Sequence, residues 1–416
     1  MPAKRQIRTW PHNPTSNAPV SYRKACKYEV YFPEPLTALR LQLDIETMSA
    51  ISEAEHAIMA LNEIPQPALK PFARLLLRTE SIASSKVEGM QMGVRELARA
   101  EARRDSGAKT GSAALEILAN IDAMELAVEE AASVEVFSIS EIESIHRLLM
   151  EEAWNAHVAG KIRTRQNWIG GNDYNPCGAD FVPPPPEEVQ PLLIDLCNAI
   201  NDDMLPPIVQ AAIVHAQFET IHPFDDGNGR TGRALIQIVL RRRKVAAAYV
   251  PPISVILAKS KERYISGLTS FREDGGGPRW IKQFSEAAAS SAYLARSYLT
   301  AVTVLVEKWR SMLRSAANPR RDSVAWRIID LLPAHPIITG PIAKAVTGVA
   351  TSQVSKAMIE LQNAGVLTPV SAGTRNRSWE AVGLLEIIGR LEAGDLPIGS
   401  TEESMPAPPH RRLLSR

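Results

Sequence analysis

Residues 222–233 read His222-Pro223-Phe224-Asp225-Asp226-Gly227-Asn228-Gly229-Arg230-Thr231-Gly232-Arg233. This polar stretch determines the local fold, because it separates two segments that have the pattern of helices. Before it, apolar residues recur at helical spacing over Pro207 to Ile221. Pro223 ends that helix, because the residue before a proline is pushed out of the right-handed α region. After it, Arg233 to Leu240 is apolar enough for a buried helix, and the basic run Arg241 to Lys244 suits its C-terminus. The sequence therefore predicts two helices joined by a tight loop.

The predicted loop gathers groups that bind and position phosphates. Glycines flank Asn228, so the backbone can adopt left-handed conformations and its successive amides can point at one anion. Arg230 and Arg233 lie one turn apart and can close on the same anion. Asp226 would repel a phosphate unless a divalent metal lies between them, and His222 titrates near neutrality and can accept a proton. This set favours phosphoryl or nucleotidyl transfer, in which positioning and charge stabilisation dominate.

The whole string resembles the Fic family signature, His-Pro-Phe-x-Asp-Gly-Asn-Gly-Arg-x-x-Arg, with every fixed position present. The resemblance implies a mainly α fold, a Fic-type helical core with a short β-hairpin flap. It also implies a protein adenylyltransferase that uses ATP and Mg²⁺ to transfer AMP to a Ser, Thr or Tyr hydroxyl of a target protein. The roles it implies are His222 as general base, Asp226 as Mg²⁺ ligand, Gly227, Asn228 and Gly229 around the phosphates, and Arg230 and Arg233 on the β- and γ-phosphates.

A second stretch, Pro71 to Gly89, is predicted to be a helix that Gly89 ends. Ser84 and Glu88 lie four residues apart and share one face of it. Taken alone, Glu88 reads as a solvated carboxylate at a helix end. However, Ser84-x-x-x-Glu88-Gly89 resembles the inhibitory motif of many Fic proteins, Ser/Thr-x-x-x-Glu-Gly/Asn. That resemblance implies autoinhibition, with Glu88 paired to Arg233 where the γ-phosphate should dock.

Residues about 166–185 are expected to form two short strands, Gln166 to Ile169 and Phe181-Val182, around a loop rich in Gly, Asn, Asp and Pro. A surface hairpin without a role is one interpretation. The resemblance identifies the segment as the Fic flap, which borders the active site and can hold a target segment by strand addition. Arg163 and Arg165 are candidate supports of this flap.

The C-terminal part is predicted to contain helices at Ser323 to Leu332, Ile338 to Val346 and Thr351 to Asn363, followed by a hairpin of Val366 to Val370 and Ser378 to Val382. This pattern resembles a winged helix-turn-helix. In a DNA-binding interpretation, Gln353, Ser355 and Lys356 face the major groove, and Arg375 and Arg377 contact phosphate. The alternative is a domain for dimerisation or target docking, since the third helix has few basic residues.

Composition and charge limit the expected binding partners and the expected cellular setting. The formal net charge of +1 over 416 residues gives no global basic field that would indicate nucleic acid. The sequence has no run of eighteen apolar residues, so no membrane span is expected, and no signal-peptide region follows the first residues. Cys26, Cys177 and Cys197 look too few and too scattered for a disulfide framework or a zinc site. A reduced, cytoplasmic setting is therefore expected.

These observations give an expected domain order. Residues 1–110 form an N-terminal helical region, whose first 35 residues are an extended arm and whose inhibitory helix lies at about 71–89. Residues 111–312 form the Fic core with the flap at about 166–185 and the motif at 222–233. Residues 318–390 form the winged-helix-like domain, and residues 391–416 a disordered tail.

Other functions stay open at this point. Within enzymes, the chain could remove AMP, with a carboxylate such as Glu88 positioning water, or could use another nucleotide. A rival of a different class is a DNA-binding transcriptional regulator whose Fic core senses nucleotide, although the intact His222 argues against an inactive enzyme. A homodimer is compatible with the resemblance.

Overall fold

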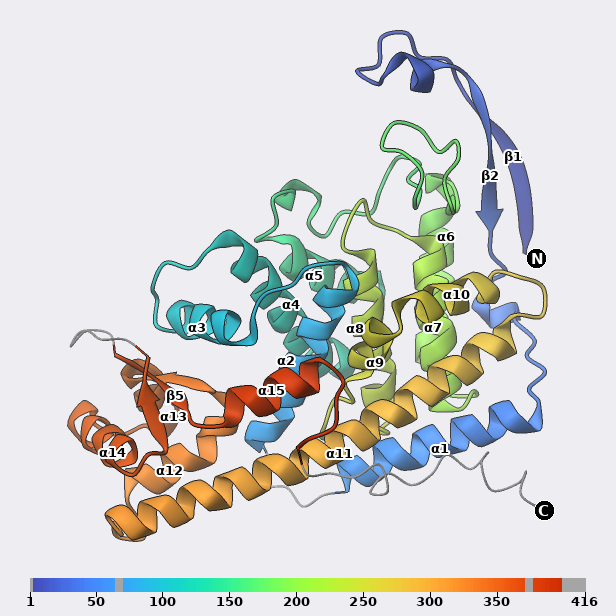
Figure 1. The fold of residues 1–416 in the computed structure, drawn as a ribbon. Helices are drawn as coiled ribbons and strands as arrows, with labels where there is room; N and C mark the ends of the chain where they lie inside the picture. The colour runs from blue at the N-terminus through green and yellow to red at the C-terminus, as the bar shows by residue number, and fades with distance from the viewer. Residues whose placement is uncertain (1–2, 64–69, 371–376, 399–416) are drawn as a thin grey trace. The chain divides into compact units, whose positions relative to one another are not determined.

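The computed structural model describes residues 3–63, 70–370 and 377–398 (Figure 1). The fold is mainly helical, as expected, and it divides into two compact units. The first unit contains residues 1–55, 119–247 and 261–286, and the second contains residues 56–118, 248–260 and 287–416. Three helices run through both units, and they are α1 (Ile45–Asn62), α4 (Ser112–Glu129) and α11 (Gly277–Ala316).

The first unit is built around α7 and carries the sequence stretch with which the prediction began. Its elements are β1 (Lys4–Trp10), β2 (Cys26–Phe32), α5 (Ile139–Met150), α6 (Pro186–Asn201), the central α7 (Pro207–Ile221), α8 (Asn228–Arg242) and α10 (Lys261–Phe271). Every residue of α7 from Ile208 to Ile221 is buried, polar side chains such as Gln210, His215 and Glu219 included, so the helix is enclosed on all sides. Trp280 donates its indole N–H to the Ala212 carbonyl oxygen at 2.8 Å. This central helix therefore gives the loop that follows it a rigid base.

The N-terminal segment differs from the extended arm that the sequence predicted. Strands β1 and β2 pair antiparallel from Lys4 opposite Phe32 to Trp10 opposite Cys26. The Cys26 and Cys177 sulfurs form a disulfide with a Cα–Cα distance of 6.2 Å. The expectation that the cysteines are too few and too scattered for a disulfide was therefore wrong. The two residues lie 151 positions apart, so only the fold brings them together.

The second unit combines helices with a small sheet around one apolar core. The sheet has the order β3-β5-β4, and both pairs are antiparallel. The core includes Leu76, Trp309, Ile329, Met358 and Leu384. The elements are α2 (Lys70–Val87), α3 (Val94–Asp105), α9 (Ile253–Lys259), α12 (Val324–Leu331), β3 (Ile337–Thr339), α13 (Gly340–Thr347), α14 (Thr351–Asn363), β4 (Leu367–Pro369), β5 (Ser378–Ala381) and α15 (Leu384–Glu392).

The C-terminal helices and hairpin follow the predicted order, and α14 has the predicted bounds, but residues 337–339 form the strand β3 where the sequence predicted the start of a helix. Gln353, Ser355 and Lys356 are exposed on α14, while Arg375 lies outside the described residues, as do residues 399–416 of the expected tail. The winged-helix assignment and DNA binding stay predictions. No helix in the described ranges is both long and apolar enough to cross a membrane.

Candidate active site

His222 is held in an unusual backbone conformation where α7 ends. It is the C-cap residue, with φ 49° and ψ 61°, and its N–H donates to the Phe218 carbonyl oxygen at 2.9 Å. The left-handed region costs a residue other than glycine about 1–2 kcal/mol. Two side chains fix this geometry, because the His222 carbonyl oxygen accepts from Arg163 Nε at 2.8 Å and from Asn167 Nδ2 at 3.2 Å. The imidazole is half-buried beside the loop that follows.

Arg163 joins the flap to the end of α7, as the sequence predicted. It is 3% exposed, and its Nη2 donates to the Pro184 carbonyl oxygen at 2.6 Å and to the Ile221 carbonyl oxygen at 3.3 Å. Its Nη1 donates to the Arg165 carbonyl oxygen at 3.0 Å. Burial lowers the pKa of the Arg163 guanidinium to about 10, so the group stays charged at neutral pH. Arg165 contributes this carbonyl, and its side chain is exposed.

The flap is shorter in regular structure than the two predicted strands. Ile169 and Phe181 form an isolated antiparallel bridge, with Ile169 N–H donating to the Phe181 carbonyl oxygen at 2.9 Å. The Arg272 guanidinium lies 3.7 Å from the centre of the Phe181 ring, a cation–π contact. Asn167 also donates to the Phe224 carbonyl oxygen at 3.0 Å. The flap is therefore held on one side by the loop after α7 and on the other by Arg272, which follows α10.

The N-terminal hairpin lies against this flap. In addition to the disulfide, the Tyr22 and Tyr174 rings stack with centres 5.5 Å apart, and Trp10 meets the edge of Trp168 at 5.9 Å. Asn175 Nδ2 donates to the Tyr22 carbonyl oxygen at 2.9 Å. These contacts make the hairpin part of the flap's own support, which the sequence did not predict.

Asp226 is positioned by two residues that the sequence analysis did not single out. Asn155 Nδ2 donates to Asp226 Oδ2 at 2.9 Å, and His146 Nε2 lies 2.9 Å from the Asp226 carbonyl oxygen. The Gly160 N–H donates to His146 Nδ1 at 2.9 Å, so the neutral imidazole carries its proton on Nε2 and donates it to Asp226. Burial lowers the pKa of His146 to about 4, which keeps the ring neutral at pH 7.

The Asn228 side chain holds the loop through two hydrogen bonds to Phe224. Its Oδ1 accepts from the Phe224 N–H at 2.9 Å, and its Nδ2 donates to the Phe224 carbonyl oxygen at 2.8 Å. The Phe224 ring in turn stacks on His146 with centres 3.6 Å apart and planes at 1°. The Asn228 side chain therefore shapes the loop, and its expected contact with phosphate stays a prediction.

Gly227 is required by backbone conformation and by space. Its φ is 74°, and a Cβ there would lie 2.9 Å from Met150 Sδ and 3.1 Å from His146 Nε2. Helix α8 begins at the next residue, so the amides of its first turn point out of this loop. Arg230 and Arg233 follow on α8 and are 3% and 0% exposed. The structure therefore brings His222, Asp226, Gly227, Gly229, Arg230 and Arg233 together on one loop and one helix.

The loop supplies only part of the ligand set that a divalent cation needs. The described residues contain no group of three or more His, Cys, Asp or Glu that could hold a metal ion on its own. Mg²⁺ is usually bound by one or two carboxylates together with substrate phosphates. The Asp226 carboxylate at the mouth of an amide-lined loop fits this mode.

The inhibitory-motif residues belong to the second unit. Ser84 is buried on α2, and Glu88 is exposed directly after the helix ends at Val87. Gly89 has φ 86°, and the Met90 N–H donates to the Ser85 carbonyl oxygen at 3.1 Å, which confirms the predicted glycine end of the helix. Because Arg233 belongs to the first unit, the Glu88–Arg233 pair stays a prediction.

The chain is similar to known proteins over the residues that contain this loop. Residues 136–240 match the model of the Fic/DOC family, and residues 48–129 match that of the Fic/DOC family N-terminal segment. Protein adenylyltransferase fic-1 of Caenorhabditis briggsae is 35% identical over 132 residues, which are 31% of this chain and 23% of that protein. Protein adenylyltransferase Fic of Nematostella vectensis is 34% identical over 170 residues, 39% of this chain and 35% of that protein.

The chain thus spans about a third or less of the length of these relatives. Among solved structures, a Fic family protein from Desulfovibrio desulfuricans G20 has a TM-score of 0.53 and 18% identity. The match covers 85% of this chain and 99% of that one, and at this identity it supports the fold alone.

Proposed function

Because this chain belongs to the Fic/DOC family through residues 48–129 and 136–240, we propose that it transfers AMP from ATP to a hydroxyl group of a target protein. The observation that carries the proposal is the loop from His222 to Arg233. In this loop the backbone of His222 is fixed, Asp226 supplies a carboxylate and Gly227 is the N-cap of α8. Two buried arginines, Arg230 and Arg233, follow on that helix.

His222 is the general base of this proposal. It takes the proton of the target's Ser, Thr or Tyr hydroxyl while the oxygen attacks the α-phosphorus of ATP. A new P–O bond forms to the target, the bond to the bridging oxygen of the β-phosphate breaks, and pyrophosphate leaves. Arg163 and Asn167 keep the His222 backbone in place, so the ring does not have to reorganise during the step.

The phosphates bind at the start of α8. The backbone N–H groups of Gly227 to Gly229 surround the α- and β-phosphates, and Arg230 and Arg233 stabilise the charge that develops on the leaving pyrophosphate. The two hydrogen bonds from the Asn228 side chain to the Phe224 backbone keep these N–H groups oriented toward the phosphates. Asp226 would hold Mg²⁺, which would neutralise phosphate charge and align the nucleotide.

The flap places the target. Backbone groups beside the Ile169–Phe181 bridge offer hydrogen bonds to an extended target segment whatever its side chains are. Glu88 restrains the reaction when it pairs with Arg233 and takes the place of the γ-phosphate, so that ATP binds with its α-phosphate out of line. The exposed position of Glu88 at a helix end suits such a removable contact.

Position-labelled ATP tests the reaction. The Glu88→Gly variant is incubated with Mg²⁺, a cell extract and ATP that carries radioactive phosphorus at either the α- or the γ-position, beside the Glu88→Gly/His222→Ala control. We expect protein-bound label from the α-position alone and its loss in the control. Label from the γ-position, or α-label that survives without His222, would contradict AMP transfer by this site. Competition by unlabelled GTP, CTP and UTP would report the base preference.

A further inference from the structure

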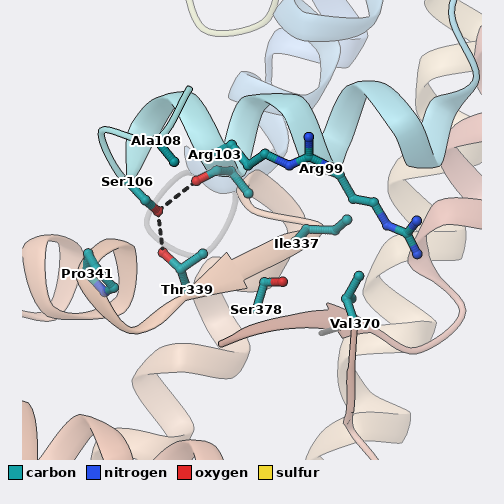
Figure 2. Close-up of a pocket in the computed structure, with 10 residues that line it drawn as sticks. Arg99, Arg103, Ser106, Ala108, Ile337, Thr339, Pro341, Val370 and Ser378 are labelled. Atoms are coloured by element: carbon teal, nitrogen blue, oxygen red, sulfur yellow. Dashed lines mark hydrogen bonds between the residues drawn. The ribbon is translucent and has the colours of Figure 1, made fainter. Parts of the chain in front are cut away.

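A pocket in the second unit lies between α3 and the small C-terminal sheet (Figure 2). It has a volume of about 300 Å³, at the lower end of the range in which proteins bind small molecules. Arg99, Arg103 and Ser106 line it from the α3 side. Ile337 and Thr339 of β3 and Ser378 of β5 line it from the sheet. The pocket belongs to neither the His222 loop nor the flap.

The charges of α3 are distributed unevenly between this pocket and the rest of the helix. Arg95 forms a bidentate pair with Glu380 at 2.8 and 2.9 Å, and Arg104 lies 3.5 Å from Asp105. Arg99 and Arg103 form no ion pair with any residue in the described part of the chain. The two arginines of this helix that lack a carboxylate are therefore the two that line the pocket.

The spacing of these two arginines suits one shared anion. Residues four apart lie on the same face of a helix, and both guanidinium groups stay charged at neutral pH. Figure 2 shows both side chains extending along the same side of the pocket, with Arg99 reaching toward Val370. Two guanidinium groups match the double charge and the several oxygens of a phosphate monoester better than one carboxylate does.

The remaining walls are fixed and partly apolar. Ser106 Oγ donates to the Ala102 carbonyl oxygen at 2.7 Å and shares a 3.0 Å hydrogen bond with Thr339 Oγ1, which joins the end of α3 to β3. Thr339 is 5% exposed and Ile337 is 3% exposed, so this side of the pocket is part of the folded core. A preformed wall lowers the cost of ordering a ligand.

We propose that this pocket binds a small phosphate monoester, with its phosphate on Arg99 and Arg103 and a compact apolar body against Ile337 and Val370. The pocket volume and the mixture of two cations with apolar side chains define this ligand class. The site is independent of the AMP transfer proposed for the first unit.

The test is a titration of the full chain with phenyl phosphate, and with phenol as the uncharged comparison, by calorimetry. Arg99→Gln/Arg103→Gln removes the two pocket charges. The matched control is Arg95→Gln/Arg104→Gln, which removes two charges from the same helix outside the pocket. We expect phenyl phosphate to bind the wild type and the control alike and the pocket variant at least about tenfold more weakly, with no binding of phenol.

Thermal unfolding gives a second measurement, because a ligand that binds only the folded state raises its melting temperature. Phenyl phosphate should raise it in the wild type and control and not in the pocket variant. Absence of saturable binding up to about 10 mM, or equal binding by both double variants, would overturn the proposal. So would a short DNA duplex that binds through Arg99 and Arg103 while phenyl phosphate does not.

Discussion

Replacing Gly227 by alanine tests the geometry at the start of α8. Gly227 has φ 74°, and the added Cβ would lie 2.9 Å from Met150 Sδ and 3.1 Å from His146 Nε2. His146 is stacked on Phe224 and donates to the Asp226 carbonyl oxygen, so it cannot move without releasing the loop. The substitution should therefore disturb His222, the proposed base, and the Asp226 carboxylate together.

The expected loss has two parts. The left-handed backbone costs alanine about 1–2 kcal/mol. Overpacking against Met150 and His146 adds about 1–3 kcal/mol. The matched control is Gly178→Ala in the flap loop, where φ is 79° and no atom lies within 4 Å of the new Cβ. The control has the backbone cost alone, so the difference between the two variants isolates the packing cost.

Urea unfolding followed by tryptophan fluorescence measures both losses, and AMP transfer is measured in the Glu88→Gly background. We expect Gly227→Ala to lose about 2–5 kcal/mol and most of its activity, and Gly178→Ala to lose about 1–2 kcal/mol. Equal losses in the two variants would refute the arrangement of His146 and Met150 around Gly227.

Three further predictions concern charge and sulfur. Arg78 is 2% exposed and pairs with Glu101 at 2.9 Å and Glu392 at 3.3 Å, so Arg78→Met should cost about 3–5 kcal/mol near pH 7. Burial raises the pKa of Glu392, and in the variant its protonation removes the charge that Arg78 no longer pairs. The stability loss of Arg78→Met should therefore be smaller near pH 5, and a larger loss there would contradict the reasoning. Folding lowers the pKa of His146 from 6.5 to about 4. The neutral ring therefore contributes about 3 kcal/mol to the free energy of unfolding above pH 6.5, and this contribution disappears as the pH falls to 4. Unfolding titrations of His146→Gln should show a flatter pH dependence over that range, and an unchanged slope would count against it. Alkylation of the denatured protein, purified without reductant, should modify Cys197 alone before reduction and three cysteines after it, and three before reduction would disprove the disulfide.

Local signals in the sequence located many of the helices. The proline at the first helical position of α7 and the glycine after α2 mark boundaries that backbone chemistry enforces, so these two helices were predicted nearly to the residue. Helix α3 was missed, because its buried residues are mostly alanines among charges and give a weak apolar pattern.

The site itself was predictable only where its residues are consecutive. His222, Asp226, Arg230 and Arg233 share one loop and one helix, and their spacing reveals them. His146, Asn155 and Asn167 act from other segments through single hydrogen bonds, and no pattern in the sequence marks such partners. The same holds for Cys26 and Cys177.

Intact-mass measurement of three purified proteins tests the central claim most directly. Wild type, Glu88→Gly and Glu88→Gly/His222→Ala are each incubated with Mg²⁺ and ATP and then weighed. The account predicts that the Glu88→Gly protein alone gains the mass of AMP, because only this variant lacks the proposed Glu88 contact to Arg233 and keeps His222. An equal gain in wild type would contradict restraint by Glu88, and a gain in the double variant would contradict the role of His222.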